Sequence, residues 1–249
     1  MNFSQLGFGS FVLRINGIFI AIIFFVSVLH YYKILQKEKL DTDFFAHNFW
    51  RWVLVGLLFG RILALLLSPE IFANFGWMSP FVFWIGGINF YGTFLGALGM
   101  MFYDLKNTEH NPLKWLDLAT PSILMAILLT DLSEFITGAV YGTKTNLPWG
   151  IQYETFGVDT ISPVHPVTIY SFIIHFLILL WVFKYRERFL RFPGKLISIT
   201  AVIFFFAEFF LQFFRGDPTL MLGNTLRIEQ IFSLLIVVGI VAYLKKRQN

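Results

Sequence analysis

Long apolar runs, separated by short polar connections, repeat along the whole chain. Seven of these runs approach the length of about 20 residues that an α-helix needs to cross a bilayer. They cover roughly residues 14–35, 50–68, 81–103, 116–137, 165–184, 194–214 and 228–244. The second run contains Arg61, and the fourth contains Asp131 and Glu134. The pattern predicts an all-α polytopic membrane protein with about seven transmembrane helices.

The positions of the basic residues predict how these helices are oriented. Cytoplasmic connections of membrane proteins are enriched in Lys and Arg. The connections after the first, third and fifth runs and the end of the chain, with the adjoining ends of the runs, carry nearly all Lys and Arg residues. The exceptions are Arg14, Arg61, Lys144, Arg215 and Arg227. These connections are therefore expected to face the cytoplasm, with the C-terminus inside. The seven crossings then place the N-terminus outside.

Only one outer connection is long, and it joins the fourth and fifth runs. Its residues, 138–164, are rich in Gly, Pro, Thr and Asn, which are typical of turns and loops. We expect a small extracytoplasmic cap here, because the segment has no room for an independent domain. No internal repeat or low-complexity linker divides the chain, so residues 1–249 are expected to form a single transmembrane domain.

Composition supports the membrane class and limits the chemistry. Charged residues make up 14% of the chain, against about 25% in an average soluble domain, and hydrophobic residues make up 57%. The chain has no cysteine, which excludes a disulfide framework, a thiol nucleophile and a cysteine metal site. The five histidines are scattered along the sequence. We therefore expect no metal, no cofactor and no nucleic-acid partner.

Polar residues within the apolar runs mark the candidate chemistry. Charged groups at membrane depth are costly, and they are retained mostly where they face a polar cavity or another polar group. The densest stretch, residues 130–166, runs from Asp131 and Glu134 through the cap to His165, and we interpret it as the outer mouth of an intramembrane site. Other polar residues that share helix faces are Arg61, Asn89, Thr93, Thr168, Ser171, His175, Glu208, Gln212, Arg215, Glu229 and Gln230.

Each of these features also has a structural explanation. Arg61 either neutralises Asp131 or Glu134 as a buried ion pair or binds a substrate. His175 fits an interior hydrogen-bonded histidine, with a proton shuttle as the alternative. Arg215 either ends a helix or binds an anion. The glycine pairs that fit close helix packing are Gly56/Gly60, Gly92/Gly96 and Gly138/Gly142.

The functional interpretation of the residues is a pocket embedded in the bilayer and open to the outside. Arginine in such a pocket suits an anionic group, because its planar fork matches phosphate bidentately and each bond is strong at low dielectric. The natural anionic ligand at that depth is a phospholipid headgroup.

Short motifs follow one another in a definite order from about residue 14 to residue 244. They are Arg14-Ile15-Asn16-Gly17, Gly60-Arg61-Ile62, Gly86-Gly87-Ile88-Asn89-Phe90-Tyr91-Gly92, Asp117 with Pro121, Phe135-Ile136-Thr137-Gly138 with Gly142 and Leu147-Pro148-Trp149, His165-Pro166 with Tyr170, and Phe213-Phe214-Arg215-Gly216-Asp217-Pro218 with Gln230 and Ser233. This order resembles that of the prolipoprotein diacylglyceryl transferase family.

The resemblance implies a multi-pass protein of the bacterial cytoplasmic (inner) membrane that acts in lipoprotein biosynthesis. Its reaction would move the diacylglyceryl group of phosphatidylglycerol, or of another anionic phospholipid, to the lipobox cysteine thiol of a prolipoprotein signal peptide. A thioether forms and glycerol phosphate leaves. The implied catalytic residues are Arg215, Tyr91, Asp131 and Glu134. The implied substrate-binding residues are Arg14, Asn16, Arg61, Asn89, Gly92, Gly138, Gly142, His165, Tyr170, Glu208 and Gln230.

Several motif positions depart from the family pattern. Asp131 stands where the family has an arginine, and Glu134 where it has an asparagine. Tyr91 replaces a histidine, Asn16 a tyrosine and Thr143 an arginine. A carboxylate in place of a phosphate-binding arginine reverses the local charge and would repel an anionic headgroup.

Three explanations of this departure remain open. Asp131 and Glu134 pair with Arg61, Arg14 or Arg215 in a rewired site that still transfers. Alternatively, the donor or acceptor differs, or the protein is a catalytically inactive paralogue that binds lipid. Outside the family, a proton-coupled transporter would use a relay made of Asp131, Glu134, Glu208 and His175.

Overall fold

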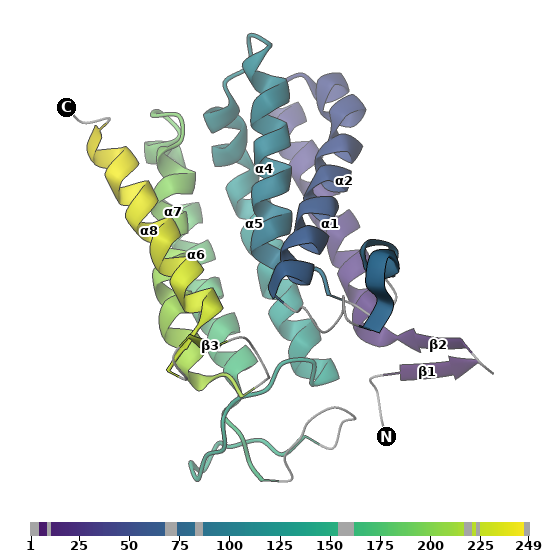
Figure 1. The fold of residues 1–249 in the computed structure, drawn as a ribbon. Helices are drawn as coiled ribbons and strands as arrows, with labels where there is room; N and C mark the ends of the chain where they lie inside the picture. The colour runs from purple at the N-terminus through teal and green to yellow at the C-terminus, as the bar shows by residue number, and fades with distance from the viewer. Residues whose placement is uncertain are drawn as a thin grey trace. The chain divides into compact units, whose positions relative to one another are not determined.

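The computed structural model describes residues 5–8, 11–67, 74–82, 87–153, 162–216, 221–222 and 225–246. The chain divides into two compact units, Met1–Ile34 with Leu116–Asn249 and Leu35–Trp115, which we call the first and the second unit. Seven long α-helices account for most of the described residues (Figure 1). Six of them, all except α4, are long and apolar enough to cross a membrane. The prediction of an all-α polytopic membrane protein is confirmed.

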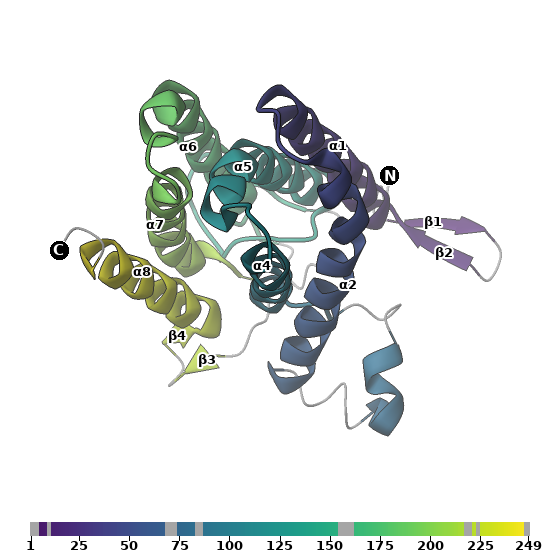
Figure 2. The same ribbon diagram turned by 90° about the horizontal axis from the view of Figure 1, so that it is seen from above.

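The first unit holds most of α1 (Ile15–Lys37) and most of α5 (Pro112–Thr137), together with three later helices. These are α6 (Val167–Phe189), α7 (Lys195–Leu211), which continues as the short 3-10 helix η3 (Gln212–Phe214), and α8 (Ile228–Lys246). Two small antiparallel hairpins accompany them: β1 (Gln5–Phe8) with β2 (Phe11–Arg14), and β3 (Met221–Leu222) with β4 (Leu226–Arg227). Helix α7 packs against both α6 and α8 (Figure 2).

Buried polar contacts join α5 to its neighbours in this unit. The Asp117 carboxylate is fully buried and accepts hydrogen bonds from the backbone N–H groups of Gly194, at 2.6 Å, and Ile197, at 2.8 Å. These donors open α7, so Asp117 satisfies helix N–H groups that have no acceptor within their own helix. His30 of α1 lies 2.8 Å, from Nδ1 to Oγ, from Ser122 of α5.

The second unit is built on α2 (Thr42–Leu67) and α4 (Phe90–Lys106), with the 3-10 helix η1 (Gly76–Phe81) beside α2. Glycines let α2 and α4 approach closely. A Cβ atom added to Gly92 would lie 2.7 Å from the Phe59 carbonyl oxygen and 2.9 Å from the Gly60 Cα. The small-residue packing expected for Gly60 and Gly92 is therefore present between these two helices.

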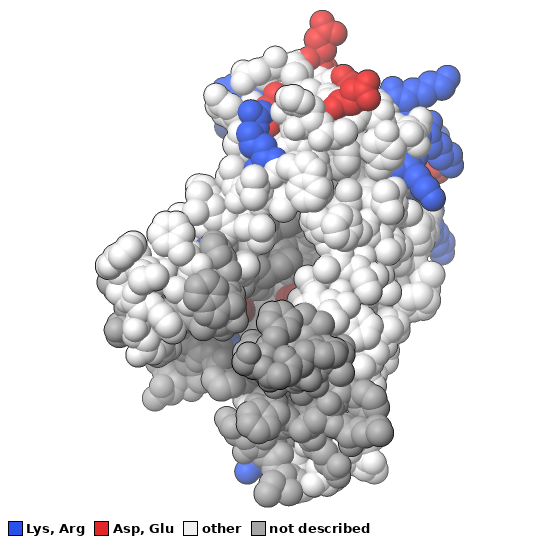
Figure 3. All heavy atoms as spheres, turned by 90° about the vertical axis from the view of Figure 1, so that its right-hand side faces the viewer, with Lys and Arg blue, Asp and Glu red and all other residues white. Residues whose placement is uncertain are grey.

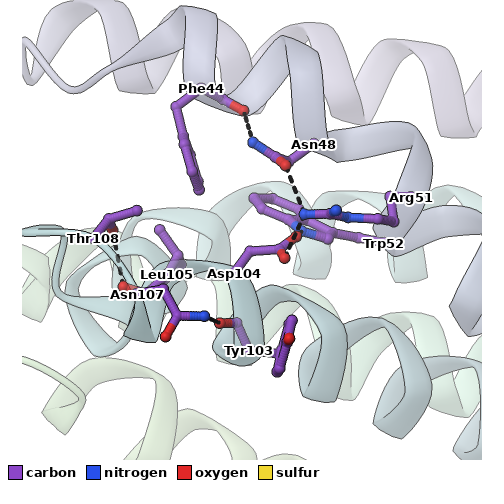
Figure 4. A network of polar contacts seen from close by, with 9 residues as sticks. All are labelled: Phe44, Asn48, Arg51, Trp52, Tyr103, Asp104, Leu105, Asn107 and Thr108. Atoms are coloured by element: carbon purple, nitrogen blue, oxygen red, sulfur yellow. Dashed lines mark hydrogen bonds and ion pairs between the residues drawn. The ribbon is translucent and has the colours of Figure 1, made fainter.

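A buried carboxylate fixes the other end of the same helix pair (Figure 4). Asp104 of α4 accepts hydrogen bonds from the Arg51 guanidinium and from the Trp52 indole N–H, the latter at 2.6 Å. Arg51 also donates to the Asn48 side-chain oxygen at 2.9 Å, and Asn48 donates to the Phe44 carbonyl at 2.8 Å. The charge of Asp104 is thus met within the unit, as a group removed from water requires.

The third predicted run, 81–103, differs most from the observed helix. Helix α4 begins only at Phe90 and has 17 residues, because Gly87 takes a positive φ of 83° and Asn89 caps the helix by accepting a hydrogen bond from the Gly92 N–H at 3.2 Å. Before Phe90, the described part of the predicted run consists of Phe81, which ends the 3-10 helix η1, and of Val82 and residues 87–89, which are not helical. The predicted orientation of the helices, the seventh crossing and the single-domain organisation stay predictions.

The surface agrees with a bilayer environment. Large apolar side chains are exposed on the long helices, among them Leu54, Leu66, Leu177 and Leu235. On the face drawn in Figure 3, most described atoms belong to residues other than Lys, Arg, Asp and Glu. Such a surface suits helices that face lipid.

The contact between α2 and α4 predicts how two glycine substitutions will differ. Gly92→Ala places a methyl group against backbone atoms of α2, so we expect it to lower the free energy of unfolding by about 1–3 kcal/mol. Gly99→Ala, on the same helix with nothing within 4 Å of the added atom, is the matched control and should be neutral or stabilising. Thermal unfolding of the two variants in detergent measures this difference. Equal melting temperatures would show that the close approach is absent.

Candidate functional site

A histidine between two carboxylates forms the most polar part of the first unit. His175 of α6 is 1% exposed, and its Nδ1 lies 2.6 Å from Oδ2 of Asp131 on α5. Its Nε2 lies 3.2 Å from Oε1 of Glu208 on α7, within ion-pair range although the angles do not make a hydrogen bond. Three helices thus each contribute one ionisable side chain, which we call the Asp131–His175–Glu208 cluster.

Neighbouring residues hold the imidazole of this cluster in place. The ring stacks on Phe204, with centroids 4.8 Å apart and planes inclined by 24°. Phe204 precedes Glu208 by one helical turn, so one face of α7 supplies both the stacking ring and a carboxylate. The carboxylates lie at opposite nitrogens of the ring and do not converge on one point. The part of the chain that the structure describes contains no group of three or more His, Asp or Glu arranged to hold a metal ion.

A second feature of the first unit is a junction between three backbone segments far apart in the sequence. Gly142 pairs with Arg215 as an antiparallel bridge, the Thr143 N–H donates to the Phe214 carbonyl at 2.8 Å, and the Gly216 N–H donates to the Tyr141 carbonyl at 2.9 Å. On the other side, the His165 N–H donates to the Thr143 carbonyl at 3.0 Å. Residues 141–143 therefore lie as a central strand between His165 and residues 214–216.

Close backbone approach makes glycine necessary in this junction. A Cβ atom on Gly142 would lie 2.2 Å from the His165 carbonyl oxygen, and one on Gly216 would lie 2.2 Å from the Gly142 carbonyl oxygen. Both obstacles are backbone atoms, which cannot turn aside as a flexible side chain can. Gly138, which ends α5 before the cap, takes a positive φ of 65°.

Aromatic side chains attach the cap to the start of α6. The Trp149 indole N–H donates to the Tyr170 hydroxyl at 2.8 Å, and His165 Nδ1 lies 3.3 Å from the same oxygen. The ring of Phe214 packs edge-on against both His165 and Tyr170. Burial raises the pKa of Tyr153 on the cap, an effect that the neighbouring Thr168 hydroxyl partly offsets.

Arg215 lies at this junction with its side chain half-buried. Its carbonyl accepts a hydrogen bond from the Arg227 guanidinium at 2.6 Å. Gln230 is fully buried; its Oε1 accepts from the Arg227 N–H at 2.9 Å, and its Nε2 donates to the Phe209 carbonyl at 3.1 Å. Gln230 therefore links α8 to α7 and supports the segment that carries Arg215.

In the second unit, Arg61 serves backbone groups. It is 1% exposed and donates to the carbonyls of Ser79, at 2.6 Å, Val82, at 2.9 Å, and Gly87, at 2.8 Å. Asn89, besides capping α4, donates its backbone N–H to the Gly60 carbonyl at 3.0 Å, and Tyr91, two residues further on, is buried. Four candidate site residues named from the sequence therefore lie close together in this unit: Arg61, Asn89, Tyr91 and Gly92.

The structure gives Asp131 a histidine as its partner. Among the described side chains of the first unit, the hydrogen-bond partner of Asp131 is His175, and Arg215 does not take that place. The side chains of Arg14 and Asn16 lie outside the described residues. Glu134 is half-buried one turn after Asp131 on the same face of α5.

His175 was absent from the site residues that the family resemblance implied, and the sequence grouped it with Asp131, Glu134 and Glu208 only as the relay of a proton-coupled transporter. The sequence indicated an interior hydrogen-bonded histidine, and that prediction is confirmed. Helical spacing could not decide whether these residues meet, because it shows which residues share a face and not which helices adjoin. The only signal was that His175 and Glu208 are polar residues within apolar runs, as Asp131 is.

The chain is similar to known proteins over most of its length. The model of the prolipoprotein diacylglyceryl transferase family matches residues 4–245. The chain is similar to proteins named phosphatidylglycerol–prolipoprotein diacylglyceryl transferase from several bacteria. The relative from Clostridium tetani is 28% identical over 242 residues, which cover 91% of this chain and 90% of that protein. The relative from Gloeobacter violaceus is 27% identical (94% and 88% covered), and the relative from Clostridioides difficile is 31% identical (78% and 76% covered).

The glycine junction gives a prediction about local stability. Gly142→Ala must push the central strand away from His165, so the amides that bond residues 141–143 to their neighbours should exchange with solvent faster than in the wild-type protein. Gly239→Ala on α8, where an added Cβ meets nothing within 4 Å, is the control and should leave exchange at the junction unchanged. Hydrogen exchange measured by mass spectrometry on the cap peptides tests this. Unaltered protection in Gly142→Ala would contradict the close packing.

Proposed function

This chain belongs to the prolipoprotein diacylglyceryl transferase family, and we propose that it transfers a diacylglyceryl group from phosphatidylglycerol to the lipobox cysteine thiol of a prolipoprotein. The extent of the family match and the names of the relatives support this activity. Its place of action would be the bacterial cytoplasmic membrane, where phosphatidylglycerol and the signal peptide of the prolipoprotein are both available.

The geometric observation that carries the proposal is the junction of Gly142, His165 and Arg215. Three of the sequence motifs that resemble the family meet there through backbone hydrogen bonds, although they are widely separated along the chain. A guanidinium held at such a junction is a suitable group for a lipid phosphate. The half-buried position strengthens its hydrogen bonds relative to water.

The reaction places defined demands on the site. The cysteine sulfur attacks the glyceryl carbon that carries the phosphate ester, the carbon–oxygen bond to phosphate breaks, and glycerol phosphate leaves. Negative charge grows on the departing phosphate oxygen, and the Arg215 guanidinium would stabilise that charge. His165 and Tyr170 would border the same region from the start of α6.

The carboxylate at position 131 fits a site whose charges have been rearranged better than a site with an unpaired negative charge. Because the Asp131 carboxylate is bound to His175, its charge is already met and need not repel a phosphate near Arg215. A catalytically silent lipid-binding role remains the second candidate, because the signature position no longer carries an arginine. The two candidates differ in turnover, which an assay measures directly.

Arg215→Gln tests the proposed role of the guanidinium. We expect transfer from phosphatidylglycerol to a lipobox peptide to fall by about 10²–10³-fold, the usual cost of removing one group that stabilises transition-state charge. Arg188→Gln, an exposed arginine near the end of α6, is the control and should transfer at the wild-type rate. The readout is the mass increase on the peptide cysteine. Wild-type turnover in Arg215→Gln would remove Arg215 from the site, and no turnover in the wild-type protein would favour the silent lipid-binding role.

Asp131→Arg tests whether the carboxylate at position 131, where the family has an arginine, has merely inactivated the enzyme. The new guanidinium would stand against the His175 ring in a buried place, so we expect a lower melting temperature and no gain in transfer rate. Asp131→Asn, which keeps the size of the side chain and a hydrogen-bonding group, is the matched variant. Asp117→Arg would not serve as a comparison, because it removes the carboxylate that caps α7. A transfer rate above that of the wild-type protein in Asp131→Arg would show that the chain is a damaged enzyme.

A further inference from the structure

We propose that the Asp131–His175–Glu208 cluster is the proton relay that removes the thiol proton of the acceptor cysteine. This inference rests on the proposed transfer reaction and adds to it the groups that accept the proton. Glu208 would take the proton at the site, His175 would share it through Nε2, and Asp131 would hold the ring through Nδ1.

The need for such a relay follows from the chemistry of the acceptor. A thiol is a poor nucleophile until it becomes a thiolate. In the balanced reaction the sulfur–hydrogen bond and the carbon–oxygen bond to phosphate break, and the carbon–sulfur bond forms. The proton passes to the relay and then to the released glycerol phosphate or to water. No oxidant, reductant or metal is required.

The geometry of the cluster suits a relay. Asp131 fixes the ring orientation through a hydrogen bond of 2.6 Å, which leaves Nε2 directed towards Glu208. Nε2 is buried without a hydrogen bond, although Oε1 of Glu208 is only 3.2 Å away. A small change in the Glu208 side chain would therefore complete the bond, as catalytic hydrogen bonds often tighten only when substrate is present.

Burial decides which member of the cluster meets the proton donor. The His175 side chain is 2% exposed and the Asp131 side chain 10% exposed, whereas the Glu208 side chain is 17% exposed. The imidazole cannot reach a substrate itself, so it acts as a positioning and relay group behind Glu208. Glu208, the most exposed member of the cluster, is therefore the group that would meet the thiol.

The neighbours of the two histidines favour the cluster over His165 as the place where the proton is taken. His165 has a neutral neighbour, the Tyr170 hydroxyl, at 3.3 Å, whereas His175 lies between two carboxylates that stabilise the protonated ring. Other polar or ionisable groups lie one or two helical turns from the members of the cluster, among them Glu134 on α5, Thr168 and Ser171 on α6, and Gln212 at the end of α7.

The relay can be tested with an acceptor peptide whose nucleophile is already ionised and needs no base. A selenocysteine lipobox peptide is ionised near neutral pH, so it bypasses proton removal, whereas the cysteine peptide depends on it. For His175→Gln we expect transfer to the cysteine peptide to fall by about 10²-fold or more, and transfer to the selenocysteine peptide to fall by less than about tenfold. Glu208→Gln should give the same pattern and serves if His175→Gln does not fold.

His30→Gln is the matched control, because His30 is also a helix histidine of the first unit with a side-chain neighbour, the neutral Ser122 hydroxyl. It should lower neither rate. Equal losses for both peptides in folded His175→Gln and Glu208→Gln would reduce the cluster to a structural role and overturn the relay, as would wild-type rates in both variants. If the wild-type protein transfers to neither peptide, the transfer reaction itself fails and the relay with it.

Discussion

A carboxylate inside an apolar helix is tolerated only where another group of the protein meets its charge, and the hydrogen bond between Asp131 and His175 does this for α5. The bond joins α5 to α6, and the adjacent Glu208 brings in α7. Leaving either member of a buried pair alone costs about 3–5 kcal/mol, so the helices are held in one arrangement. The same arrangement brings α6 and the end of α7 to the junction that carries Arg215.

The same rule explains the second unit. The described chain around Ser79, Val82 and Gly87 is not α-helical, and its carbonyl groups need donors that lipid cannot supply. Arg61 supplies three such bonds from α2, which is why a fully charged side chain is buried there. Asp104 with Arg51 and Trp52 is a further case of a charge met inside its own unit. A buried charge in this protein is therefore a structural requirement first, and its chemical use has to be argued separately.

Much of the fold could be predicted from the apolar runs, because a membrane helix must be long and apolar throughout. The run at 116–137 corresponds to α5 (Pro112–Thr137), and the run at 165–184 to α6 (Val167–Phe189). The late start of α4 could not be read from hydropathy, since it depends on the positive φ of Gly87 and on the cap at Asn89. Whether Asp131 and His175 meet was equally hidden, because this depends on which helices adjoin. Arg61, one of the arginines that the sequence suggested as a partner for Asp131 or Glu134, donates to carbonyl groups of its own unit.

The proposed function depends on the hydrogen bond between Asp131 and His175. This bond meets the charge of a carboxylate that would otherwise repel a lipid phosphate, and it orients the imidazole for proton transfer. A double-mutant cycle with Asp131→Asn, His175→Gln and the combined variant measures the strength of this interaction, through free energies of unfolding in detergent. The account predicts a coupling energy of at least about 1 kcal/mol between the two positions, as for residues in direct contact. Effects that add to within about 0.5 kcal/mol would show that the two side chains do not interact, and would contradict it.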